Sequence, residues 1–227
     1  MIRYAGAIGT AVAGAFGLAL LAANSTGATT TVSMEELGKA LFFDTNLSAN
    51  RTEACASCHD PNFAFTDPRG MASPGDDGVS LGDRNAPTAA YASFSPAFHR
   101  NEKGEWIGGQ FLDGRAATLE EQAGGPPLNP AEMGMPDKAA VVDRLRENPD
   151  YRANFAALFG ADVMDDPDAA YDAMTKAIAA FERTDEFAPF DSKYDRFLRG
   201  EAKLTKLDKV ARMVLFLHHC RIESQRR

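Results

Sequence analysis

The residues best suited to chemistry in this chain are Cys55, Cys58 and His59, which form the pentapeptide C-x-x-C-H. Two cysteines at this spacing can each form a thioether bond with a vinyl group of haem, and the adjacent histidine can then present an imidazole to the iron. The motif therefore predicts one covalently attached haem c, with His59 as a ligand of its iron.

Two other interpretations of the cysteine pair are a disulfide and a zinc site with a distant fourth ligand. A zinc site built on Cys55, Cys58 and His59 would usually come with a second paired motif, and only the segment His218-His219-Cys220 offers one. Neighbouring residues rarely both reach one metal ion. The haem interpretation is therefore favoured, and it leaves Cys220 without a role.

The N-terminus has the pattern of an export signal. Arg3 precedes an apolar stretch over residues 5–23, and small and polar residues follow up to Ala28. This order of a basic start, an apolar middle and a small-residue exit is typical of a cleaved signal peptide. We expect residues 1–28 to be removed and the remaining chain to be periplasmic.

The net charge of −8 limits the choice of partners. An acidic protein is poorly suited to bind nucleic acid or an anionic membrane, and it can attract a basic redox protein instead. No second long apolar run follows the N-terminal one. We therefore expect a soluble mature protein without a nucleic-acid partner.

The hydrophobic pattern predicts helices and no strands. Ser33 followed by Glu36, and Thr118 followed by Glu121, are typical of helix N-termini. The expected helices span residues 34–43, 118–123, 137–148, 151–159, 168–181, 190–198 and 207–217. Apolar residues in the last of these have the spacing of a buried face, which predicts core packing. Without a second domain to cover it, this helix is expected to expose apolar surface.

The segment from Thr66 to Trp106 is rich in Gly, Pro, Asp and Ser and has little periodicity. A long irregular segment in a compact domain is usually functional or disordered. Covalent attachment of a haem and ligation of its iron could order such a loop. We expect the loop to wrap around the haem.

Several stretches together resemble the bacterial di-haem cytochrome c peroxidases and their MauG-like relatives. They are LGKALFFDTNLSANRTEACASCHDPNFAFTD, RNAPT, GGQFLDGRAATLEEQAGGPPLNPAEMG, AIAAFERT and FDSKYDRFLRG, in that order along the chain. The resemblance implies an all-α, cytochrome c-like haem domain with long loops around a covalent haem. In this family the N-terminal domain reacts with hydrogen peroxide, and a C-terminal domain carries a second haem that supplies electrons.

The resemblance also implies roles for individual residues. Cys55 and Cys58 would be the thioether attachments, His59 the proximal iron ligand, Glu132 the distal glutamate, Gln122 the distal glutamine, Arg115 a partner of a haem propionate, and Asn85 a residue that helps to bind calcium. A carboxylate near the iron could take a proton from one peroxide oxygen and return it to the leaving oxygen, which is the role expected of Glu132.

Each of these polar residues also has a plainer interpretation. Glu132 could be a surface carboxylate that caps the turn after Pro130. Gln122 could be a solvated position of a short helix, and Arg115 could form a surface ion pair.

The chain departs from the family pattern near the iron and along the electron route. Residues 60–84 contain no histidine that could be a second iron ligand. We therefore expect a five-coordinate or water-bound iron, with His99 at the surface. Met71, Met133 and Met135 are expected to be core fillers. Leu112 stands where many relatives carry a tryptophan, so electron hopping would need another aromatic residue.

The expected organisation is a signal peptide over residues 1–28, a peroxidatic domain over 29–203, and the truncated start of a second haem domain over 204–227. The resemblance leads one to expect another C-x-x-C-H near the end, and Cys220 lacks the partners for it. Hydrogen peroxide is the expected substrate, and a small cytochrome c or cupredoxin the expected electron donor.

Three alternatives stay open. The chain could be a mono-haem electron carrier without peroxidase activity, or a non-functional gene fragment that never receives haem. A second haem lobe could also be supplied by a separate chain or through a homodimer.

Overall fold

The fold is known from a computed structural model that describes residues 32–214. The predicted signal peptide and the segment His218-His219-Cys220 lie outside the described residues. Within residues 32–214, no helix combines the length and apolar character needed to cross a membrane.

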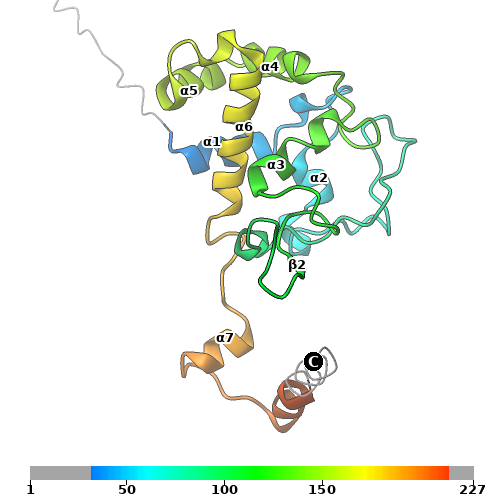
Figure 1. The fold of residues 1–227 in the computed structure, drawn as a ribbon, viewed down its shortest axis with the longest axis vertical. Coiled ribbons are helices and arrows are strands. Elements are labelled where there is room, and N and C mark those ends of the chain that lie inside the picture. The colour runs from blue at the N-terminus through cyan, green and yellow to red at the C-terminus, as the bar shows by residue number, and fades with distance from the viewer. Residues whose placement is uncertain (1–31, 215–227) are drawn as a thin grey trace, which may run out of the picture. The chain divides into compact units, whose positions relative to one another are not determined.

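The described part of the chain is rich in helix and poor in sheet (Figure 1). The α-helices are α1 Met34–Phe42, α2 Cys55–Cys58, α3 Leu119–Ala123, α4 Lys138–Glu147, α5 Pro149–Phe159, α6 Pro167–Glu182 and α7 Lys193–Leu198, and residues 206–214 are also helical. Short 3-10 helices cover Thr45–Leu47, Pro61–Phe63, Ala92–Phe94, Pro126–Leu128 and Val163–Asp165. Two short strands are β1 His99–Arg100 and β2 Trp106–Ile107.

The helix starts predicted from capping residues are confirmed. At the N-terminus of α1, the Glu36 backbone N–H donates to Ser33 Oγ, and the Ser33 backbone N–H donates to the Glu36 carboxylate at 2.7 Å. At the N-terminus of α3, the Thr118 hydroxyl accepts from the Glu121 backbone N–H. These bonds satisfy amide groups that have no partner inside the helix.

Helices α1 and α6 cross at close range, and Gly38 makes the crossing possible (Figure 1). A Cβ atom added at Gly38 would lie 1.8 Å from the carbonyl oxygen of Ala177 in α6. No side chain fits at that distance from a backbone oxygen. The missing side chain of Gly38 therefore sets how closely these two helices pack.

Aromatic rings fill the core beside this crossing. Phe42 makes edge-to-face contacts with Phe181 and Phe187, each with ring centroids 5.5 Å apart. Phe65 stacks on Phe187 at 3.9 Å. Edge-to-face and stacked pairs stabilise a core beyond the burial of their surface. The aromatic cluster thus connects α1 and the end of α6 to the loop that follows the C-x-x-C-H motif.

Two predicted helix boundaries are wrong by a few residues. Helix α5 begins at Pro149 and not at Tyr151, because proline fits the first turn of a helix as well as it ends the preceding one. Asn148 accepts a backbone hydrogen bond at the N-terminus of α5 and also ends α4. Helix α7 begins at Lys193 and not at Phe190, with Ser192 as its N-terminal cap.

The prediction of an all-α fold without strands is wrong in one detail. Strands β1 and β2 pair in antiparallel register, with His99 opposite Ile107 and Arg100 opposite Trp106. Each strand has two residues, too few for a sequence alternation to be visible. The indole of Trp106 stacks on the Phe98 ring at 5.0 Å and is 65% exposed.

Core packing of the last helix, its plainer interpretation, is wrong for the described part, whereas the exposed apolar surface expected without a second domain is present there. Leu207 is 76% exposed, and Val210, Met213 and Val214 are exposed as well. The helical spacing of these residues is present, but nothing within residues 32–214 covers them.

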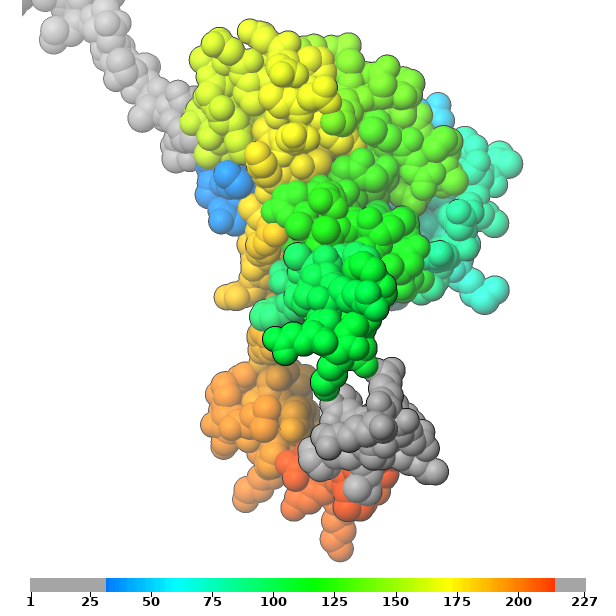
Figure 2. Space-filling model, in the orientation of Figure 1, coloured from blue at the N-terminus to red at the C-terminus, as the bar shows by residue number. Residues whose placement is uncertain are grey.

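The segment over residues 66–106 is mostly irregular, as predicted, and Asp76 anchors it. The Asp76 carboxylate accepts hydrogen bonds from the backbone N–H groups of Asn50 and Thr52, which lie just before the C-x-x-C-H motif. The Asp76 backbone N–H donates to the carbonyl of Glu132 at 2.7 Å. In the space-filling view this segment (teal) borders the surface of residues 120–135 (green) (Figure 2).

Candidate functional site

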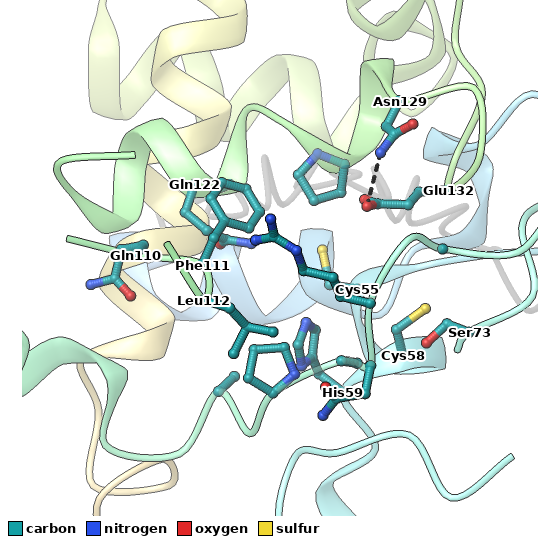
Figure 3. Close-up of a pocket in the computed structure, with 18 of the residues that line it drawn as sticks. Cys55, Cys58, His59, Ser73, Gln110, Phe111, Leu112, Gln122, Asn129 and Glu132 are labelled. Atoms are coloured by element: carbon teal, nitrogen blue, oxygen red, sulfur yellow. Dashed lines mark hydrogen bonds between the residues drawn. The ribbon is translucent and has the colours of Figure 1, made fainter. Parts of the chain in front are cut away.

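A cavity of about 560 Å³ lies between the C-x-x-C-H motif, the irregular segment, α3 and the end of α6 (Figure 3). Its volume is within the range of roughly 300–1,000 Å³ that is usual for sites of small molecules and cofactors. The chemically relevant residues that line it are Glu53, Cys55, Cys58, His59, Ser73, Asp83, Arg84, Asn85, Gln110, Asp113, Arg115, Gln122, Asn129, Glu132 and Glu182. Leu112, Leu119, Ala123, Met133 and Ile178 supply apolar wall.

The two cysteines lie at the cavity as free thiols. Burial, together with the nearby Glu182 carboxyl, raises the pKa of Cys55 to about 12. Burial also raises the pKa of Cys58, against the opposing effects of Ser73 and Arg69. Both sulfur atoms are therefore neutral, unbridged and open to the cavity.

The disulfide and zinc interpretations do not match this arrangement. Cys55 and Cys58 are not bonded to each other. Within residues 32–214, no three side chains of His, Cys, Asp or Glu come together in a group that could hold a metal ion. Both thiols are free and line the cavity.

His59 is held by the turn that follows the motif. Its Nδ1 lies 3.1 Å from the carbonyl oxygen of Phe65, which can only accept, so Nδ1 carries the proton. Burial lowers the pKa of His59, so the ring is neutral. With Nδ1 protonated, Nε2 is the ring nitrogen that carries the lone pair, since a bond at one ring nitrogen fixes the tautomer at the other.

The turn that presents the Phe65 carbonyl has an unusual backbone. Ala64 and Phe65 both have positive φ angles, 53° and 57°. Residues with a side chain rarely adopt this left-handed conformation, and two in succession store strain. The surrounding contacts must hold this turn in place, and the Phe65–Phe187 stack is one of them.

The distal candidates lie on the opposite side of the cavity from His59 in the close-up view (Figure 3). Glu132 is half-buried, and its Oε1 accepts a hydrogen bond from Nδ2 of Asn129 at 2.9 Å. Burial raises the pKa of Glu132, while Asn129 and Arg115 oppose that rise. Gln122, from α3, also lines this side of the cavity. The structure thus brings both predicted distal residues to one cavity with the C-x-x-C-H motif.

Cations lie at the rim of the cavity. Arg115 Nη1 is 3.0 Å from Oδ1 of Asp113, and Arg84 Nη1 is 2.8 Å from Oδ2 of the same carboxylate. The Arg115 guanidinium also stacks 3.6 Å above the centroid of the Phe111 ring. Two guanidinium groups share the Asp113 carboxylate, and Asp83 lines the same cavity. Arg115 therefore forms the ion pair of its plainer interpretation, and it also lines the cavity.

The other predicted residues are placed as follows. Asn85 is exposed and lines the cavity. His99 is exposed on β1, as expected, with Nδ1 2.7 Å from the carbonyl of Ala97. Met133 and Met135 are buried core residues, but the expectation for Met71 is wrong because this side chain is 90% exposed in the irregular segment.

Two buried carboxyl groups beside the cysteines were not predicted. Glu182, at the end of α6, and Glu53 are both buried, line the cavity, and have an Oε2 atom without a hydrogen-bond partner. Glu53 forms an ion pair with Arg69 at 3.0 Å. The signal for Glu182 was available: it lies four residues after Ile178, on the buried face of an amphipathic helix.

Comparisons with known proteins show which family the chain resembles. A family model described as di-haem cytochrome c peroxidase matches residues 33–203. MauG, the methylamine utilization protein of Paracoccus denitrificans, is 56% identical over 191 residues, which cover 82% of this chain and 49% of that protein. The cytochrome c peroxidase Ccp of Escherichia coli is 38% identical over 165 residues, which cover 73% of this chain and 31% of that protein.

Solved structures show the same similarity. The diheme peroxidase BthA of Burkholderia thailandensis matches with a TM-score of 0.72 and 36% identity, covering 76% of this chain and 43% of that one. A MauG-like protein associated with microbial copper homeostasis matches with a TM-score of 0.61 and 37% identity, covering 78% and 47%. The chain thus spans about half or less of the length of these relatives.

Proposed function

The chain belongs to the di-haem cytochrome c peroxidase family, and from this premise we propose that it binds one haem c in the cavity and reduces hydrogen peroxide there. The single observation that carries this proposal is the cavity that joins Cys55, Cys58 and His59 to Glu132 and Gln122. An attachment motif alone would suit an electron carrier equally well. A half-buried carboxyl and an amide in the same cavity support an enzyme.

The residues present fit a haem. Cys55 and Cys58 would form the thioether bonds, each thiol adding its sulfur and its proton across one vinyl group. His59 would ligate the iron through Nε2, because Nδ1 is engaged by Phe65. Arg84 and Arg115, which both contact Asp113, would pair with the haem propionates at the rim.

When bound, the haem would supply an iron centre that exchanges electrons with peroxide. Reduction of hydrogen peroxide to two waters takes two electrons and two protons. Glu132 would accept the proton of one peroxide oxygen and return it to the other, and its raised pKa makes it a stronger base than a free glutamate. The Gln122 amide would orient peroxide by hydrogen bonds, and Asn129 would hold the Glu132 carboxyl toward the cavity.

The electrons would come from a small redox protein in the periplasm, such as a cytochrome c or a cupredoxin. The acidic charge of the chain suits a basic donor. A periplasmic location follows from the predicted signal peptide. We also propose that Asn85 helps to bind calcium, as the resemblance to the family implies.

The test starts with expression of the full chain in a host that matures c-type cytochromes. Haem staining after denaturing electrophoresis should detect covalent haem in the wild type, and the double variant C55A/C58A should lose it. Absence of covalent haem from the wild type would refute the proposal.

The second step measures peroxide consumption by the haem-loaded protein with a chemically reduced cytochrome c as donor. Glu132→Gln should retain haem and lose peroxide reduction by about a hundredfold or more, the usual contribution of an acid–base group. Glu186→Gln, an exposed carboxylate paired with Lys39, is the matched control and should react like the wild type. Equal activity of E132Q and wild type would favour the alternative, a mono-haem electron carrier.

A further inference from the structure

Glu182 is a second buried carboxyl group, and the peroxide reaction proposed for Glu132 does not involve it. It is the last residue of α6, its side chain lines the cavity, and the residue is 5% exposed. Its Oε2 atom is buried without a hydrogen-bond partner. An unpaired polar atom in such a position is rare and calls for a functional or structural reason.

Among residues 32–214, no cation forms an ion pair with this carboxyl. The guanidinium of the next residue, Arg183, donates to both oxygens of Glu120 in α3, at 2.7 and 3.1 Å. Three charged or titratable groups act on Glu182. They are Arg183 at the C-terminal cap of α6, Glu120 on α3, which pairs with Arg183, and the Cys55 thiol on α2. The favourable effect of Arg183 is opposed by Glu120.

An unpaired carboxylate is strongly disfavoured when it is buried, so the group binds a proton instead. Burial raises the pKa of Glu182 to about 8. Near neutral pH the side chain is thus close to its titration point, at the wall of the cavity beside a haem attachment residue. A change of charge in the cavity would shift its protonation further.

We propose that Glu182 takes up a proton when the haem in this cavity is reduced, and that it releases the proton on reoxidation. The inference rests on the proposed function, since it requires that haem occupies the cavity. One electron from an external reductant adds one negative charge to the cavity contents. The Glu182 carboxylate then binds one proton from solvent, so the two charges balance.

This coupling makes electron uptake depend on pH in a defined direction. Where Glu182 is ionised before reduction, proton uptake accompanies the electron, and the midpoint potential falls as the pH rises. Where Glu182 is already protonated, reduction involves no proton at this site. Glutamine has nearly the same shape and stays neutral, so Glu182→Gln imitates the protonated form at every pH.

The test is a potentiometric titration of the full-length, haem-loaded chain, followed by its optical spectrum. Wild type and E182Q should have the same midpoint potential at about pH 6 and should diverge by about pH 9, with the wild type lower. Glu182→Asp keeps a carboxyl group and should restore the pH dependence. Glu186→Gln, four residues further along the chain and exposed, should behave as the wild type.

An infrared difference spectrum, reduced minus oxidised, provides an independent readout at about pH 8. The wild type should gain a carbonyl band of a protonated carboxyl on reduction, and E182Q should lack that gain. Haem propionates contribute equally to both proteins, so the difference between them isolates Glu182.

Parallel pH curves for wild type and E182Q, or an unchanged infrared band, would overturn the inference. If E182Q fails to fold or load haem, the wild type still decides, because a midpoint potential that does not fall between about pH 6 and pH 9 would overturn the inference. Haem staining and peroxide consumption of the wild type test the proposed function separately. A protein with covalent haem and peroxidase activity but no Glu182 effect would refute only the present inference.

Discussion

Asn129 Nδ2 donates to Glu132 Oε1 at 2.9 Å, and the two residues lie in one tight turn after the 3-10 helix Pro126–Leu128. The same asparagine accepts from the Ala131 backbone N–H at 3.0 Å. Asn129 thus shapes the turn with its oxygen and stabilises the ionised form of Glu132 with its nitrogen.

This pair predicts the effect of Asn129→Asp on the pH profile of the peroxide reaction. Aspartate keeps the acceptor for Ala131 but replaces the donor with a negative charge, so the pKa of Glu132 should rise further. The acid limb of kcat/KM for peroxide should move to higher pH by about one unit or more. Asn154→Ala, in α5, is the control, and an unchanged acid limb in N129D would exclude Glu132 as the base.

The crossing of α1 and α6 predicts that Gly38→Ala is destabilising. Alanine normally favours a helix by about 1 kcal/mol over glycine, but its Cβ would meet the Ala177 carbonyl at 1.8 Å. We expect a net loss of about 1–3 kcal/mol in the free energy of unfolding, measured by urea titration. Gly70→Ala is the matched control, because the nearest atom to its Cβ is 3.9 Å away. Equal stability of G38A and wild type would show that the helices can move apart.

The left-handed backbone of Ala64 predicts that Ala64→Gly is stabilising. Ala64 is exposed and has φ 53° and ψ 41°, so its side chain brings strain and little packing. Glycine should raise the free energy of unfolding by about 0.5–1 kcal/mol. Ala153→Gly, at an exposed position inside α5, should lower it by about 1 kcal/mol. A destabilised A64G protein would mean that this turn is not strained.

Burial of Glu182 predicts how stability depends on pH. Its pKa of about 8 in the folded chain lies above the ordinary value of 4.5, so the folded state binds more protons between these values than the unfolded state. The contribution of this group to stability should therefore fall as the pH rises through that range, by at most about 1.4 kcal/mol per pH unit. Urea titrations at about pH 6 and pH 9 should show a smaller loss for E182Q than for wild type or E186Q. Identical losses would show that Glu182 is not protonated in the folded protein.

Local signals in the sequence were enough for most of the helices. Ser33 and Thr118 placed the starts of α1 and α3, because capping depends on residues close in sequence. The start of α5 was missed because Pro149 was interpreted only as the end of α4. The pairing of β1 and β2 was missed because strands of two residues carry no alternation.

Tertiary relationships were less accessible from the sequence. The residues Cys55, His59, Gln122 and Glu132 could be named, and their meeting at one cavity required the fold. The role of Glu182 could not be inferred from the sequence, because it depends on the residues packed around the end of α6. One of them, Arg183, pairs with Glu120 and not with Glu182. The exposure of Leu207 was hard to predict for a similar reason. The spacing of apolar residues predicts an apolar helix face, but it does not show which segment covers that face.

The wall of the cavity formed by Ile178 and Glu182 has a consequence for biogenesis. Under the proposed export, the attachment motif would leave the export machinery before α6, which follows the intervening helices in the chain. Contacts between segments so distant in sequence form late, because the chain between them must first be ordered. The thiols of Cys55 and Cys58 would therefore be uncovered until the end of α6 arrives, and this interval is when a maturation enzyme could reach them.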